Sequence, residues 1–200
     1  MDMKLYLVRH GETQMNVDKL YYGWTDCPLN ENGERQAEKL KEFFKTVPLD
    51  KIICSSLLRA SSTAEKINEG KNIPIFKEDD FRELHFGAWE GKDFCHIKEN
   101  YPEEYRQWAK DWQGFAIPEG EAFSVFYERV TNRLQQLISE EEENSSILLV
   151  SHNGVMSAML CYLTGAGPSS FWRFNFSQEA YSMVSIRRGN IVIEKINSTL

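Results

Sequence analysis

The chain has 200 residues, of which 42% are hydrophobic and 26% are charged, and its formal net charge is −7. These values are ordinary for one globular domain that buries a substantial core. The negative charge argues against general binding to nucleic acids or to anionic membranes, because both are negatively charged themselves.

We expect no targeting or membrane segment. Its first residues lead directly into a short apolar run, unlike a signal peptide, and no window is long and apolar enough to cross a bilayer. The four cysteines lie far apart and form no zinc-type pair. We therefore expect a cytoplasmic protein with reduced thiols and no metal site.

The first predicted strand ends in an arginine and a histidine. Residues 4–8 are apolar or β-prone, and Arg9, His10 and Gly11 follow directly. The glycine lets the backbone turn sharply or approach a ligand closely. In the loop that follows, Asn16 could reach the same ligand, although a role as a turn residue explains it nearly as well.

Two later segments repeat this order of strand, polar turn and helix. A strand at 51–54 is followed by Arg59 in a predicted helix, and a strand at 147–150 is followed by His152 and another helix. If the three strands are parallel neighbours, their polar side chains meet at the sheet edge where α/β proteins bind ligands. The residues brought together would be Arg9, His10, Arg59 and His152.

The remaining periodicity is that of an α/β protein. Helices are predicted over 30–45 and 122–140, and the proline in a short strand at 73–76 favours a sheet edge. Residues 181–187 and 191–196 alternate between apolar and polar side chains, which predicts a closing hairpin.

An aromatic segment lies between these elements, from Asp93 to Phe123. Its aromatic residues recur at helical spacing, which predicts a helix over 101–112 with one aromatic face, formed by Tyr101, Tyr105, Trp108 and Trp112. The ordinary role of such a face is packing against the body of the protein. A cap that lines a leaving-group pocket is the alternative.

Two arginines and two histidines at one edge suit a phosphoryl group. The planar fork of arginine matches phosphate oxygens, and helix N-termini add N–H donors. One histidine can attack phosphorus and carry the phosphoryl group, while the other donates a hydrogen bond to its oxygens. We interpret the other two histidines, His85 and His96, as structural.

A carboxylic acid is also needed, to protonate the leaving oxygen. Glu83 has apolar and aromatic neighbours, which can raise the pKa of a carboxyl group, and is the best candidate. A solvated surface position is the alternative interpretation of Glu83. Glu12 and Glu121 stay open as other proton donors.

Five blocks of the sequence resemble the histidine phosphatase superfamily, the phosphoglycerate-mutase-like proteins. They occur in that family's order and span nearly the whole chain: residues 7–13, 22–37, 55–64, 83–91 and 150–154. The resemblance implies a three-layer α/β/α sandwich with a mostly parallel central sheet. It implies a single domain over residues 1–200, with a small helical cap insertion at about 93–123, and chemistry without a metal or organic cofactor.

The resemblance also implies roles for the candidate residues. His10 would be the phosphorylated nucleophile, Glu83 the proton donor, and His152 a further catalytic group. The phosphate pocket would be formed by Arg9, His10, Asn16, Arg59 and His152.

Within the superfamily, the chain is similar to the alpha-ribazole phosphatase branch. Residues 86–91 and 118–122 carry this similarity, although the second segment is Pro-Glu-Gly-Glu-Ala where that branch often has Pro-Gly-Gly-Glu-Ser. The implied substrate is a small phosphate ester, alpha-ribazole 5′-phosphate of cobalamin nucleotide-loop assembly. A broad-specificity phosphatase, a phosphoglycerate mutase and a silent phosphate-binding module are the alternatives, and a homodimer stays open.

Overall fold

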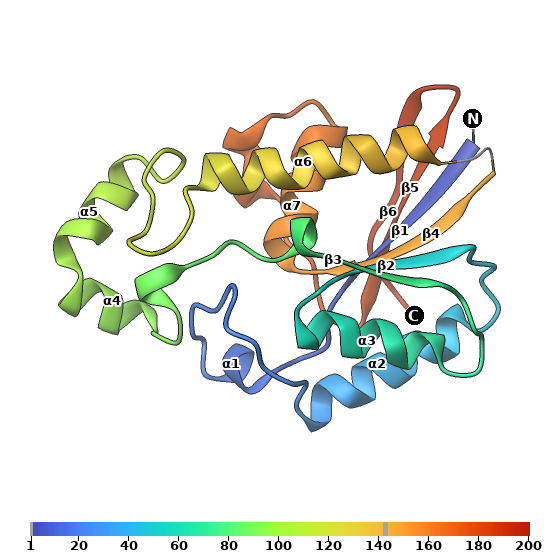
Figure 1. Cartoon of the computed structure of the whole chain (residues 1–200), viewed down its shortest axis with the longest axis horizontal. Coiled ribbons are helices and arrows are strands. Elements are labelled where there is room, and N and C mark those ends of the chain that lie inside the picture. The colour runs from blue at the N-terminus through green and yellow to red at the C-terminus, as the bar shows by residue number, and fades with distance from the viewer. Residues whose placement is uncertain (1, 142–143) are drawn as a thin grey trace.

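The computed structural model describes residues 2–141 and 144–200 and has one central six-stranded sheet (Figure 1). The strands are β1 (Asp2–Arg9), β2 (Lys51–Ser55), β3 (Ile75–Glu78), β4 (Ser146–Ser151), β5 (Ala180–Arg187) and β6 (Asn190–Thr199). Their order across the sheet is β3-β2-β4-β1-β5-β6. The first four of these are parallel, and β5 and β6 join in antiparallel pairing, so the predicted mostly parallel sheet and closing hairpin are confirmed.

Helices cover both faces of the sheet (Figure 1). Helices α2 (Glu31–Phe44) and α3 (Leu58–Asn68) pack on one face, and α6 (Phe123–Glu140) and α7 (Asn153–Leu163) pack on the other. Side chains of β4 alternate between the two cores: Leu148 and Val150 face α2 and α3, and Ile147 and Leu149 face α6 and α7. The predicted three-layer sandwich is therefore confirmed.

The N-terminus of α2 positions the loop after β1. Asn30 caps this helix, because its side-chain oxygen accepts a hydrogen bond from the Gly33 N–H at 2.8 Å. A Cβ atom on Gly33 would lie 2.1 Å from the carbonyl oxygen of Glu12. Glycine at position 33 thus allows the loop that follows His10 to lie directly against α2.

The predicted aromatic helix over 101–112 is wrong in its bounds. The segment forms two helices, α4 (Phe94–Asn100) and α5 (Pro102–Lys110), with Tyr101 between them at φ −130° and ψ 49°. Pro102 causes the break, because a proline disfavours helical backbone in the residue before it. Trp112 lies beyond the end of α5.

Helices α4 and α5 lie at one end of the molecule, beyond the carboxyl ends of the parallel strands (Figure 1). They pack on a third hydrophobic core, which we call the cap core. Its buried centre is Trp89, Ile97 and Ile117, and its half-buried margin includes Tyr21, Phe86, Tyr105 and Trp108.

The shorter elements are α1 (Gln14–Val17) and the 3₁₀ turns η1 (Asp79–Phe81), η2 (Gly87–Trp89) and η3 (Pro168–Arg173). Helix α1 falls where the sequence predicts only a loop, because Thr13 and Asn16 form a reciprocal capping box around one helical turn. Strand β3 begins two residues later than predicted, at the edge of the sheet. No helix within residues 2–141 and 144–200 has the length and apolar character needed to cross a membrane.

Candidate active site

Three adjacent parallel strands bring the polar turns together. Strands β2, β4 and β1 are neighbours, and Arg9 at the end of β1 is in register with Ser151 at the end of β4. The His10 N–H donates to the Ser151 carbonyl at 2.9 Å. As a result, the ring centroids of His10 and His152 lie 5.1 Å apart.

His10 is buried, with 3% of its surface exposed, and its tautomer is set by the backbone. Its Nδ1 atom lies 2.7 Å from the Gly11 carbonyl oxygen. Because a carbonyl oxygen only accepts, Nδ1 carries the proton and Nε2 keeps its lone pair. Burial, followed by the charges of Arg59 and Arg9, lowers the pKa of His10 well below 6.5. The ring is therefore neutral, as a nucleophile must be.

His152 is buried beside it, and its Nε2 atom lies 2.8 Å from the Ser55 hydroxyl oxygen. That oxygen accepts from the Leu57 N–H at 3.3 Å, which leaves the hydroxyl proton free to be donated to His152. In this arrangement Nδ1 carries the imidazole proton, and it has no hydrogen-bond partner in the described part of the chain. Burial and the charge of Arg59 lower the pKa of His152 as well. Its Nδ1–H is thus a donor held ready for a ligand oxygen.

Arg59 is almost fully buried and joins the site to the loop after α1. Its Nη2 and Nη1 atoms donate to the carbonyls of Gly23 at 2.7 Å and Thr25 at 3.1 Å. The guanidinium also lies over the Tyr22 ring, 4.5 Å from its centroid. Its buried Nε atom has no partner among residues 2–141 and 144–200.

Arg9 lies at the end of β1, next to His10. Its Nη1 atom donates to the Phe176 carbonyl at 2.9 Å, while its buried Nε atom, like that of Arg59, is unpaired within the described ranges. Both guanidinium groups thus keep N–H donors for an incoming anion.

The Glu83 carboxylate lies at the N-terminus of α7. Its Oε2 atom accepts from the Gly154 N–H at 2.9 Å, and Oε1 accepts from its neighbour Leu84 at 3.0 Å. Burial raises the pKa of Glu83, although these N–H groups and the two arginines act in the opposite direction. A carboxyl group that keeps its proton to higher pH is suited to act as a general acid. Glu83 is half-buried, not a solvated surface residue.

The two other candidate acids are occupied by structural partners. The Glu12 carboxylate accepts from the Asn30 side chain at 2.9 Å, where it borders the α2 cap. The Glu121 carboxylate forms an ion pair with Arg129 at 2.6 Å. Among the three glutamates, the geometry therefore favours Glu83 as a proton donor.

Asn16 stabilises a turn, and its side chain also lines a cleft. Its side-chain oxygen accepts from the Thr13 N–H at 3.1 Å and from the Gln178 side chain at 3.0 Å. It also lines a cleft of about 400 Å³ that is shared with Arg9, Tyr22 and Glu83. We call this the phosphate cleft.

A second cavity, of about 210 Å³, adjoins the phosphate cleft, and we call it the aromatic pocket. Tyr21, Glu83 and Phe86 line both cavities, so Glu83 stands where the two meet. The remaining walls of the aromatic pocket are Leu84, Trp108, Trp112, Phe123, Asn153, Gly154, Phe171 and Trp172.

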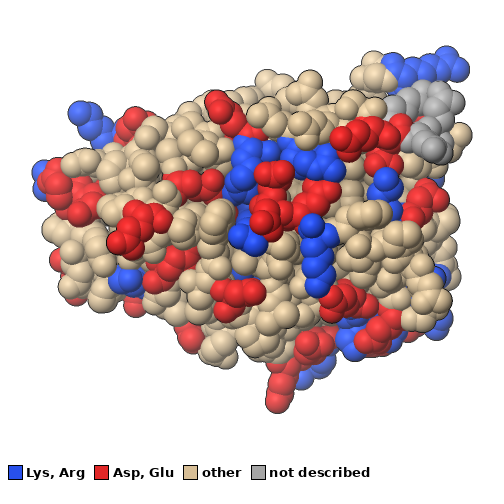
Figure 2. Space-filling view, viewed as in Figure 1, with Lys and Arg blue, Asp and Glu red and all other residues tan. Residues whose placement is uncertain are grey.

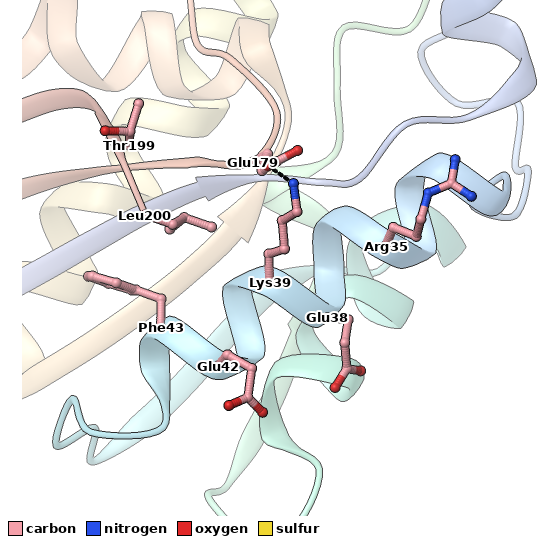
Figure 3. Close-up of a pocket in the computed structure, with 8 residues that line it drawn as sticks. All are labelled: Arg35, Glu38, Lys39, Glu42, Phe43, Glu179, Thr199 and Leu200. Atoms are coloured by element: carbon pink, nitrogen blue, oxygen red, sulfur yellow. Dashed lines mark hydrogen bonds and ion pairs between the residues drawn. The ribbon is translucent and has the colours of Figure 1, made fainter.

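A cleft of about 750 Å³, larger than either of these cavities, lies elsewhere, between α2 and the C-terminal end of β6 (Figure 3). Its walls carry charges of both signs, and Lys39 and Glu179 pair across it (Figure 3). None of its eight lining residues belongs to the polar turns at the ends of β1, β2 and β4. The phosphate cleft is lined by Arg9 at the end of β1 and by Glu83, so we place the candidate active site there.

Some residues of the site were not singled out from the sequence. Ser55, Tyr22 and Gly154 contact His152, Arg59 and Glu83. Their positions next to the predicted strand ends and within the family-like blocks are the signals that could have identified them. The two histidines interpreted as structural lie outside the cluster: His85 stacks on Trp24 with centroids 4.6 Å apart, and His96 is exposed on α4.

The buried neutral histidines should make stability depend on pH. Their folded-state pKa values lie below 6.5, so below that pH the unfolded chain binds protons that the folded chain does not. As the pH is lowered below about 6.5, the free energy of unfolding should therefore fall by about 1.4 kcal/mol per pH unit for each such histidine. Urea unfolding from about pH 7.5 to about pH 5 measures this slope. His152→Gln should reduce this pH slope by the contribution of one histidine. An unchanged slope would contradict the assignment of His152 as a buried neutral histidine.

Comparison with known proteins gives one consistent family. The model of the histidine phosphatase superfamily (branch 1) matches residues 5–199. An adenosylcobalamin/alpha-ribazole phosphatase of Salmonella typhimurium is 35% identical over 98% of this chain and 96% of its own. Phosphoserine phosphatase 1 of Hydrogenobacter thermophilus is also 35% identical, over 98% and 93%. The crystal structure of an alpha-ribazole phosphatase from Shigella flexneri superposes with a TM-score of 0.93 at 36% identity, covering 98% of this chain and 96% of that one.

Proposed function

The chain belongs to the histidine phosphatase superfamily, and on that premise we propose that this phosphatase hydrolyses alpha-ribazole 5′-phosphate through a phosphohistidine. One observation carries the proposal: Glu83 stands at the junction of the phosphate cleft and the aromatic pocket. An ester whose phosphate lies in the first cavity and whose aromatic base lies in the second would place its bridging oxygen beside this carboxyl group.

The first half of the reaction transfers the phosphoryl group to His10. Its Nε2 lone pair forms the N–P bond while the P–O ester bond breaks, and Glu83 donates its proton to the leaving oxygen. Arg9, Arg59 and the Nδ1–H of His152 stabilise the charge on the three equatorial oxygens.

The second half releases phosphate. A water molecule attacks phosphorus, and the Glu83 carboxylate takes a proton from it as the N–P bond breaks. His10 returns to its neutral form, Glu83 returns to its protonated form, and inorganic phosphate leaves. Each proton and phosphoryl transfer is assigned to a side chain of this protein, so we expect turnover in the presence of EDTA.

The aromatic pocket supports the choice of leaving group. Trp108, Trp112 and Trp172 offer ring faces on which a flat base can stack. Relatives of similar identity carry the names alpha-ribazole phosphatase and phosphoserine phosphatase. The charged backbone of serine would gain little from apolar ring faces, whereas a benzimidazole would bury most of its surface there.

We expect kcat/KM for alpha-ribazole 5′-phosphate to exceed that for phosphoserine or 3-phosphoglycerate by about 10²-fold, from the burial of one aromatic ring system. Trp172→Ala should remove much of this preference and leave turnover of ribose 5-phosphate unchanged, because Trp172 lines only the aromatic pocket. Its exposure of 64% means that the variant should fold. Phosphate release with EDTA present measures both effects, and Phe76→Ala, an exposed aromatic residue on β3, is the matched control.

Other outcomes of the same panel contradict the proposal in distinct ways. Similar rates on many esters indicate a broad-specificity phosphatase. A requirement for a bisphosphoglycerate primer indicates a mutase. Phosphate binding without turnover of any ester indicates a silent binding module.

A further inference from the structure

We propose that Arg129 is a positioning residue for the proton donor: its guanidinium helps to fix the backbone that carries Glu83, so that transfer from esters whose leaving oxygen needs a proton depends on Arg129 and transfer from esters that release a stable anion does not. The inference rests on the proposed function, since it takes Glu83 as the general acid.

Arg129 lies on α6 and binds the backbone of the segment that follows β3. Its Nη1 atom lies 2.7 Å from the Asp80 carbonyl oxygen, 3.1 Å from that of Arg82 and 3.4 Å from that of Asp79. Its Nη2 atom lies 3.5 Å from the Glu83 carbonyl oxygen. One side chain thus contacts four of the five carbonyl groups from 79 to 83.

Glu121 pairs with Arg129 and also binds the chain after Glu83, and we call these two side chains the clamp. Its Oε1 atom accepts from Arg129 Nη2 at 2.6 Å and from the His85 N–H at 3.0 Å. The ion pair therefore holds the chain both before and after Glu83. Its side chains are only 16% and 14% exposed, so the pair is screened by water far less than a surface pair.

The segment leaves the sheet, and two other side chains hold it besides Arg129: Trp24 Nε1–H donates to the Glu83 carbonyl at 3.0 Å, and the Ser151 hydroxyl donates to the Phe81 carbonyl at 2.8 Å. Beyond η1 it belongs to no strand, and Phe81 is its one buried residue between 79 and 85. On the face that carries α6, basic and acidic side chains adjoin in the middle of the molecule, where α6 passes the segment after β3 (Figures 1 and 2). These charges form local pairs rather than one continuous patch of a single sign (Figure 2).

The clamp also aligns Glu83 with its hydrogen-bond partner. Gly154, which binds the Glu83 carboxylate, belongs to α7, and α6 and α7 share one hydrophobic core. Arg129 therefore ties the Glu83 backbone to the same layer that holds Gly154. A displacement of about 1 Å between an acid and its target can lower a rate by about 10²-fold.

The choice of ester separates this role from a merely structural one. The alkyl ester ribose 5-phosphate needs its leaving oxygen protonated, whereas p-nitrophenyl phosphate releases a stable anion without a proton. The ratio kcat/KM covers only the steps up to phosphoryl transfer, so hydrolysis of the phosphohistidine does not affect it. A general loss of structure lowers kcat/KM for both esters, whereas misplacement of the acid lowers kcat/KM for the alkyl ester alone.

The substitution to test is Arg129→Lys, which keeps the charge and removes the fork. We expect kcat/KM for ribose 5-phosphate to fall by about 30-fold to about 100-fold, and that for p-nitrophenyl phosphate by less than about 3-fold. Arg133→Lys is the matched control. Arg133 lies one turn further along α6, and its side chain is similarly buried, at 18% exposure. It forms a bidentate pair with Glu78 on β3, which does not contact Glu83. Loss of this bidentate geometry should therefore change neither kcat/KM value by more than about 2-fold.

Two further variants make each outcome decisive. Glu83→Gln must show the same split between esters, and if it lowers both values equally, the proton-donor role in the proposed function fails. If Glu83→Gln shows the split and Arg129→Lys does not, the positioning role fails. Should Arg129→Lys not fold, Glu121→Gln removes the ion pair at a smaller structural cost. A split with that variant supports the clamp, and equal values for both esters overturn it.

Discussion

Replacing His10 by alanine should lower turnover by about 10⁴-fold or more and abolish labelling of the protein by a phosphate ester. The expected loss is this large because His10 would supply the bond to phosphorus, and removal of a nucleophile costs far more than removal of one hydrogen bond. Rapid acid-free quenching with a radiolabelled ester measures the phosphoprotein, and phosphate release measures turnover.

His96→Ala is the matched control for this experiment, because His96 is exposed on α4, away from the strand ends. The His96→Ala protein should still be labelled by the phosphate ester and should release phosphate at the parent rate. The fold of His10→Ala is checked by its thermal unfolding, since truncation of a buried ring leaves a cavity. Substantial turnover by a folded His10→Ala protein would exclude a phosphohistidine at this position.

Gly154→Ala should preserve the fold and lower kcat/KM for ribose 5-phosphate by about 10²-fold. A Cβ atom at this position would lie 2.2 Å from Glu83 Oε1 and 3.0 Å from its carboxyl carbon. The clash falls on the movable end of a side chain, so the carboxyl group moves and the helix does not. Alanine is also a better helix former than glycine, which offsets the local strain.

The effect of Gly154→Ala is specific if a similar clash elsewhere has no effect. Gly114 offers this control, because a Cβ atom there would lie 2.5 Å from the carboxylate of Asp111, an exposed residue. Gly114→Ala should leave kcat/KM for ribose 5-phosphate within about 3-fold of the parent value. Equal losses in the two variants would mean that the displaced Glu83 carboxylate is not the cause.

The sheet edge could be predicted from the sequence because each signal is local. The apolar runs before Arg9 and His152 indicate buried strands, and the polar turns directly after these runs indicate where the strands end. Parallel pairing of β1, β4 and β2 then places these turns side by side. The order of the family-like blocks supports the same arrangement.

The bounds of the aromatic helix could not be predicted from spacing alone. Tyr101, Tyr105, Trp108 and Trp112 keep a helical period across a break that a single residue, Pro102, imposes. The side chains still gather on one side because all of them pack toward the cap core or the aromatic pocket. Periodicity indicates which residues share a face, and it does not show that one helix presents them.

The environment of Glu83 was the least predictable part of the site. Its partner Gly154 is 71 residues away, and the bond uses a backbone N–H, a group that every residue except proline has. The acceptors of Arg129 are likewise backbone carbonyls. Contacts of this kind leave no pattern of side chains in the sequence, so they become visible only in three dimensions.

The cap core is separate from the two cores that flank the sheet, and it supports one wall of the aromatic pocket, whereas Trp112, Phe123 and Phe171 of the opposite wall pack in the core beneath α6 and α7. Substitutions around Trp89 and Ile97 can therefore alter the wall formed by Trp108, and the margin of Tyr21 and Phe86 that both cavities share, without changing the cores that flank the sheet. A lineage with this architecture can acquire new leaving groups while its phosphate chemistry stays constant. Relatives at the same identity that carry the names of different substrates are what such divergence produces.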